Sequence, residues 1–114
     1  GRILVDSLHA ARSATTLDDL AALPRSLLSY AQICDAPAEI PATAEGLIHT
    51  ARQARLLPGD GGIDLSAMFR SLPADLPVSI QIPHAVLKAR HGVDSWARMA
   101  IEKARAVLAA SAEA

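Results

Sequence analysis

Three apolar, strand-like stretches each carry a carboxylate or an amide near their end. Asp6 lies near the end of the first stretch, Gln32 near the end of the second and Gln81 near the end of the third. An unpaired polar group in a buried strand costs about 1–3 kcal/mol, so these residues need either separate local partners or a shared role. Both explanations are open at this point. If the three side chains share a site, their oxygen atoms suit Mg²⁺ or Mn²⁺.

Two further residues could contact a substrate. His9 follows Asp6 by three residues, in what we expect to be a loop leaving the strand, where it could reach a substrate hydroxyl or act as a ligand. Arg55 precedes the turn-rich segment 57–62 and could hold an anionic or polyhydroxy substrate. The alternative is that Arg55 has a structural role: its positive charge would stabilise the C-terminal end of a helix through the helix dipole.

Strand and helix patterns alternate along the chain and must position these residues. We predict strands over 2–8, 27–35 and 76–83, and helices over 15–23, 43–56, 63–72 and 93–110. Thr16 and Asp19 have the spacing of a capping box, and Thr43 is the expected N-cap of the second helix. Helical crossovers imply parallel strands in an α/β fold. In such folds sites lie at the C-terminal ends of the strands.

Composition excludes several classes of protein. The chain has 114 residues, of which 51% are hydrophobic and 20% charged, with a formal net charge of −1, as in an ordinary globular domain. The neutral charge and the lack of a basic cluster argue against a nucleic-acid partner. No apolar run approaches the roughly 20 residues of a membrane span. The single Cys34 cannot form an internal disulfide, so a cytoplasmic location is expected.

Four motifs, taken in order, resemble a known family. They are "ILVDSLHAARS", "YAQICDAP", "RLLPGDGGIDL" and "VSIQIP", and they resemble the C-terminal part of the sugar phosphate isomerase/epimerase family, which has a xylose-isomerase-like (β/α)8 barrel. Its members typically show Asp-x-x-His, then Tyr-x-Gln-x-x-Asp, then Arg-x-x-Pro-Gly-x-Gly. The resemblance runs from Gly1 to about Leu108. It implies that residues 1–114 are the C-terminal fragment of one TIM-barrel domain, with parallel strands six to eight and their helices.

The resemblance also implies a site and a function. The metal ligands would be Asp6, Gln32 and Gln81, and the substrate contacts His9 and Arg55. The cofactor would be Mn²⁺ or Mg²⁺, with Co²⁺ and Zn²⁺ as further candidates. The implied activity is a divalent-metal-dependent sugar (phosphate) isomerase or epimerase that acts through an enediolate on a small polyhydroxy, keto or hydroxy-acid substrate, provided that the full barrel is present.

One departure from the family pattern keeps other functions open. The family's eighth strand normally presents a glutamate where this chain has Gln81. An amide can ligate a metal through its oxygen, but it cannot accept a proton near neutral pH, so no catalytic residue is assigned. The alternatives are a dehydratase of the 3-dehydroshikimate dehydratase type, which resembles this set through its glutamine ligand, and a non-catalytic barrel remnant that needs another chain. A DNA-repair endonuclease of the same superfamily is disfavoured by the neutral charge.

The length gives a further expectation. A barrel of this type takes about 250 residues, so we expect this chain to need an N-terminal barrel half or to self-associate. Leu4, Leu28, Tyr30 and Ser79 are then expected to face the barrel interior and to be poorly covered.

Overall fold

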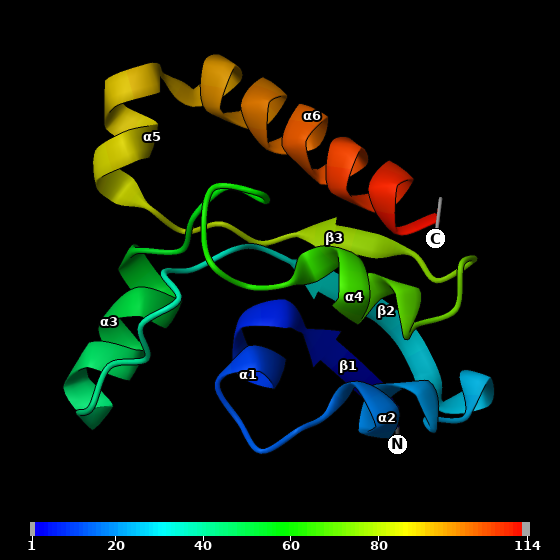
Figure 1. The fold of residues 1–114 in the computed structure, drawn as a ribbon. Coiled ribbons are helices and arrows are strands. Elements are labelled where there is room, and N and C mark those ends of the chain that lie inside the picture. The colour runs from blue at the N-terminus through cyan, green and yellow to red at the C-terminus, as the bar shows by residue number, and fades with distance from the viewer. Residues whose placement is uncertain (1, 113–114) are drawn as a thin grey trace.

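Three parallel strands organise the chain, and their order in the sheet follows their order in the sequence (Figure 1). The computed structural model describes residues 2–112. The strands are β1 (Ile3–Asp6), β2 (Leu28–Ile33) and β3 (Val78–Ile80). The helices are α1 (Ser7–Ala11), α2 (Leu17–Ala21), α3 (Ala44–Gln53), α4 (Leu65–Arg70), α5 (Ala85–His91) and α6 (Val93–Ala112), and a 3-10 turn at Arg25–Leu27 precedes β2. The predicted α/β fold with parallel strands is confirmed.

The main core lies on one face of the sheet. Alternate strand residues, among them Val5, Ala31 and Ile33, point into it because successive side chains of a strand face opposite sides. Helix α4 and the long helix α6 pack together over this face. Helix α6 buries Trp96, Ala100 and Ala104, whose four-residue spacing keeps them on one side of the helix. None of the helices within 2–112 has the length and apolar character needed to cross a membrane.

An irregularity in β2 changes which side chains face the core. Ile3 pairs with Leu28 and Val5 pairs with Ala31, so two steps along β1 match three steps along β2. This extra residue acts as a bulge and turns Leu28 to the core face, where it is 1% exposed. The expectation that Leu28 would be poorly covered is therefore wrong, because it assumed regular alternation. Leu4 and Tyr30 on the opposite face are 45% and 38% exposed, as expected.

The predicted helix starts are confirmed by their caps. The Thr16 hydroxyl accepts from the Asp19 amide at 3.1 Å, and the Asp19 carboxylate accepts from the Thr16 amide at 2.8 Å. Thr43 caps α3 by accepting from the Gly46 amide at 3.0 Å. Such side-chain caps satisfy amides that have no partner inside the helix.

Two short helices, α1 and α5, were not predicted. Helix α1 has five residues, too few for an apolar period, and it contains His9, so the expectation of His9 in a loop is wrong. Helix α5 begins after His84, whose Nδ1 accepts from the Leu87 amide at 3.3 Å. Helix α1 follows β1 directly and α5 follows β3 after residues 81–84, and each helix is started by a capping side chain.

The carboxylate of Asp35 folds the loop between α3 and α4. Its Oδ1 accepts from the amides of Ala36 (2.9 Å) and Ile63 (3.1 Å), and its Oδ2 accepts from those of Gly59 (3.0 Å) and Gly61 (3.0 Å). Asp35 is 1% exposed. A buried carboxylate is tolerated when several donors surround it, so this one side chain fixes the path of the loop.

Gly61 is required by this close approach of chain segments. A Cβ at position 61 would collide with the Ala36 carbonyl oxygen and with the Asp35 carboxylate. We therefore expect Gly61→Ala to lower the urea midpoint of unfolding clearly, because the loop must move away from the carboxylate that organises it. Asp60→Ala is the control in the same loop, since the Asp60 side chain is 42% exposed. A Gly61→Ala midpoint equal to that of Asp60→Ala would contradict the prediction.

Candidate active-site cavity

All five residues predicted for the site line one cavity of about 810 Å³, which extends along the whole of β1. These residues are Asp6, His9, Gln32, Arg55 and Gln81. Asp6 and Gln32 are register partners across β1 and β2, so their side chains leave the same face of the sheet. The backbone amide of Gln81 donates to the backbone carbonyl of Ile33 at 3.2 Å, which continues the β2–β3 pairing past the end of β3. The sheet therefore brings the three predicted ligands to one side of the molecule.

Asp6 ends β1 and begins α1. Its Oδ1 accepts from the amides of Leu8 (2.9 Å) and His9 (3.1 Å), and the residue is 8% exposed. A carboxylate at the N-cap satisfies free helix amides and lies favourably in the helix dipole. Asp6 thus holds the first turn of α1, and with it His9, at the cavity.

Arg55 is tied to Asp6 across 49 positions of sequence. Its Nη1 donates to Asp6 Oδ2 at 2.7 Å, its Nε donates to the Ala51 carbonyl at 2.7 Å, and its Nη2 lies 3.5 Å from His9 Nε2. Arg55 is 6% exposed. Burial by itself lowers the pKa of Arg55, but the hydrogen bond and charge of Asp6, with a contribution from Cys34, outweigh it and raise the pKa.

Both explanations of Arg55 from the sequence describe part of its environment. Its bond to Ala51 lies at the C-terminal end of α3, as a helix-dipole partner would, and its terminal nitrogens reach Asp6 and His9 at the cavity. The Asp6–Arg55 ion pair was not predicted. The two residues are far apart in sequence, and no local spacing signals such a contact.

Next to the ion pair, hydrogen bonds link Ser7 and Cys34, the residues that directly follow β1 and β2. The Ser7 hydroxyl donates to the Cys34 carbonyl at 2.8 Å and accepts from the Cys34 amide at 3.0 Å. The Cys34 Sγ lies 3.6 Å from Arg55 Nη1. Burial raises the pKa of the Cys34 thiol, an effect only partly offset by Ser7 and Arg55, so the thiol is a neutral packing group. Ser7 was missed in the sequence because a serine beside a candidate ligand carries no distinctive signal.

The residues described fit a divalent metal only as a partial ligand set. Of the three predicted ligands, Gln32 and Gln81 offer neutral amide oxygens, and the one carboxylate, Asp6, is already balanced by Arg55. Nowhere in residues 2–112 do three or more His, Cys, Asp or Glu side chains gather in a way that could hold a metal. A complete oxygen-ligand sphere of about six donors would need further ligands from outside these residues.

The parallel strand–helix arc with polar side chains at its strand ends is similar to part of a TIM barrel in solved structures. An IOLI protein with a binding zinc atom matches 94% of this chain at 18% identity with a TM-score of 0.73. A xylose isomerase domain protein from Alicyclobacillus acidocaldarius subsp. acidocaldarius matches 96% of this chain at 29% identity with a TM-score of 0.69. A xylose isomerase-like TIM barrel/4-hydroxyphenylpyruvate dioxygenase fusion protein matches 73% of this chain at 23% identity with a TM-score of 0.62. No protein-family model and no curated protein matches the chain.

The chain therefore has the fold of a xylose isomerase-like TIM barrel, as the motifs predicted. It spans 37%, 38% and 13% of the lengths of those three chains. The match thus covers a part of such a barrel.

Proposed function

We propose that this chain supplies one side of the active site of a divalent-metal-dependent sugar (phosphate) isomerase or epimerase. The substrate would be a small polyhydroxy, keto or hydroxy-acid compound that reacts through an enediolate. The observation that carries the proposal is the meeting of Asp6, Gln32, Gln81, His9 and Arg55 around one cavity at the carboxyl ends of parallel strands. Sites of TIM barrels lie at this end of the strands.

The roles follow from the chemistry of each side chain. Asp6, Gln32 and Gln81 would hold Mn²⁺ or Mg²⁺, with Co²⁺ and Zn²⁺ as alternatives, completed by ligands from another part of the barrel. When bound, the ion would supply Lewis acidity toward adjacent substrate oxygens. Arg55 keeps its charge at all working pH values and presents donors to substrate oxygens. His9, exposed and beside Arg55, would contact a substrate hydroxyl.

Gln81 is the reason to keep a second reaction class. Because an amide cannot take up a substrate proton, a mechanism that moves the proton between two carboxylates lacks one of them here. A dehydratase of the 3-dehydroshikimate dehydratase type is the second candidate. With an isomerase or epimerase, the substrate carbon next to the carbonyl should take up solvent deuterium without loss of water, whereas a dehydratase should release a dehydrated product.

The open strand face supports a requirement for more of the barrel. Leu4 and Tyr30 are exposed on the cavity side, and among the described residues β1 and β3 each pair with β2 alone. Exposed edges and apolar faces recruit partners, so we propose that an N-terminal barrel half, or self-association, completes the site. A remnant without catalysis would show the same association but no metal binding.

A cytoplasmic setting agrees with the single buried, unpaired cysteine.

Titration with Mn²⁺ tests the ligand set. We expect weak binding by the chain, loss of that binding in Asp6→Asn, and binding about tenfold tighter in Gln81→Glu, because ligand charge tunes the affinity of oxygen sites. Gln53→Glu adds the same charge on the exposed end of α3 and should change nothing. Calorimetry or Mn²⁺ electron paramagnetic resonance would measure the affinity. Equal binding by Gln81→Glu and the wild type would place Gln81 outside the ligand set.

A further inference from the structure

The terminal nitrogens of the Arg12 guanidinium are buried without a hydrogen-bond partner among residues 2–112, and Arg12 is not part of the wall of the larger cavity. Arg12 ends α1, where its amide donates to the Leu8 carbonyl at 3.0 Å. Both terminal nitrogens of its side chain are buried, and neither has a hydrogen-bond partner among residues 2–112. Burial lowers the pKa of Arg12, but a guanidinium keeps its proton. A buried cation without a counter-charge is unfavourable, so the fold leaves a strong anion-binding group unused.

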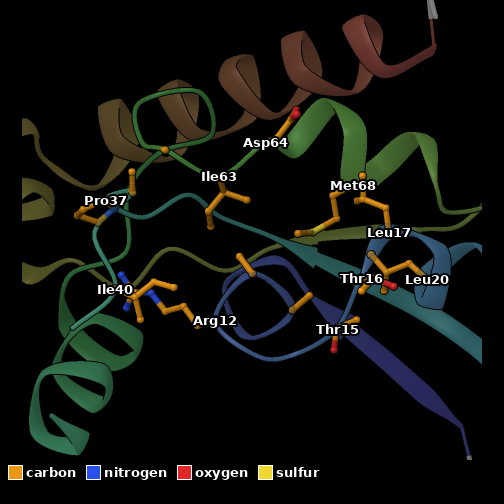
Figure 2. A pocket seen from close by; sticks show the side chains of 14 residues that line it. Arg12, Thr15, Thr16, Leu17, Leu20, Pro37, Ile40, Ile63, Asp64 and Met68 are labelled. Atoms are coloured by element: carbon orange, nitrogen blue, oxygen red, sulfur yellow. The ribbon is translucent and has the colours of Figure 1, made fainter. Parts of the chain in front are cut away.

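Arg12 forms part of the wall of a second pocket of about 290 Å³ (Figure 2). The pocket lies between the end of α1, the start of α2, the segment 37–40 and the start of α4. Most of its wall is apolar and includes Leu17, Leu20, Ile40, Ile63 and Met68. Figure 2 shows the Arg12 side chain reaching toward Ile40. A mostly apolar pocket with a few placed polar groups is typical of a small-molecule site.

The charges of the pocket restrict the ligand. Arg12 and Asp64 are the two charged residues of its wall. The Asp64 Oδ1 accepts from the Ala67 amide at 3.2 Å as the cap of α4, so its negative charge is fixed on the pocket. With one positive and one negative charge on its wall, the pocket has no net charge, which favours a ligand with a single negative charge over a dianion. A dianion such as phosphate would be repelled by Asp64.

A ligand that displaces the Ile40 side chain would reach the terminal nitrogens of Arg12, which are buried in this structure. The Ile40 side chain is 55% exposed, and residues 37–43 form neither helix nor strand. An exposed side chain on an irregular segment is held by few contacts and turns aside at little cost. The planar fork of Arg12 can then take both oxygens of a carboxylate.

We propose that this pocket binds a small organic monocarboxylate, with the carboxylate on Arg12 and a hydrocarbon body against the apolar wall. Neither Asp6 nor Arg55 lines it, and it shares only Ala10, Thr15 and Leu20 with the larger cavity. The site is therefore independent of the metal-dependent function proposed above. It holds for the chain whether or not the barrel is an isomerase.

Three probes decide the proposal on the full chain: hexanoate, its neutral analogue hexanamide, and inorganic phosphate. We expect hexanoate to bind at least about tenfold more tightly than either of the others, measured by calorimetry and by shifts of amide signals of the segment 37–40. Arg12→Gln should abolish the preference for hexanoate. It should still fold, because it removes a buried unpaired charge. Arg90→Gln, on the exposed face of α5, is the matched control and should bind as the wild type does.

Each contrary result overturns the proposal at a defined point. Equal binding of hexanoate and hexanamide by the wild type would show that Arg12 does not recognise the carboxylate, and this comparison needs no variant. Preference for phosphate would contradict the selection of a single charge by Asp64. Hexanoate binding retained by Arg12→Gln would place the carboxylate elsewhere.

Discussion

Replacing Arg55 by methionine is expected to lower the free energy of unfolding by about 3–5 kcal/mol, the usual cost of leaving one member of a buried ion pair without its partner. Arg55 Nη1 lies 2.7 Å from Asp6 Oδ2, and both side chains are 8% exposed. Methionine keeps most of the apolar stem but leaves the Asp6 carboxylate with only its two backbone donors. Urea unfolding followed by circular dichroism would measure the change.

Two comparisons separate the ion pair from other effects of the substitution. Arg25→Met removes an exposed ion pair with Asp75, whose side chains are 46% and 77% exposed, and should leave the unfolding midpoint nearly unchanged. The double variant Asp6→Asn/Arg55→Met removes both charges and should recover part of the stability lost in Arg55→Met. A double variant as unstable as the sum of the two single changes would show that the two residues act independently.

Replacing Asp35 by alanine is the second large expected effect. Four backbone amides lose a charged acceptor at once, so we expect the free energy of unfolding to fall by about 3 kcal/mol. The Gly59 and Gly61 amides should exchange with solvent deuterium at least about tenfold faster, because their bonds to Asp35 end. Asparagine keeps one acceptor oxygen and should give an intermediate result.

Asp60→Ala is the control for the Asp35 series. Asp60 lies in the same loop and pairs with Lys103 at 2.6 Å, but both side chains are well exposed, so its loss should leave the exchange of the Gly59 and Gly61 amides unchanged. If Asp35→Ala and Asp60→Ala gave the same exchange rates, the Asp35 carboxylate would not be what holds the loop.

The sequence was sufficient for the parallel strands and for α2, α3, α4 and α6, because apolar periodicity and caps such as Thr16 and Thr43 are local signals. It was not sufficient for α1, which is five residues long and is started by Asp6 itself. Nor did it reveal the bulge in β2. The pairing of Leu28 with Ile3 depends on both strands together, and a single strand read alone alternates regularly.

The site was predicted as a set of residues but not as a set of contacts. Residue type and position near strand ends brought out Asp6, Gln32 and Gln81, and these do line one cavity. The ion pair of Asp6 with Arg55 depends on distances across the fold, and so does the lack of a partner for the Arg12 guanidinium among residues 2–112. Whether a charged side chain finds a partner is a property of packing, and no spacing in one sequence encodes it.

The strands lie in the sheet in the order in which they follow one another in the sequence, β1-β2-β3. This order has a consequence for how further strands can be added to the sheet. Each strand docks beside the strand that precedes it, and in the part of the chain described here both outer strands keep one unpaired edge. A further strand–helix unit joined at either end can therefore extend the sheet without breaking an existing pairing. Gene duplication and fusion could lengthen this architecture one unit at a time, with each new strand end adding its polar residue to the same rim.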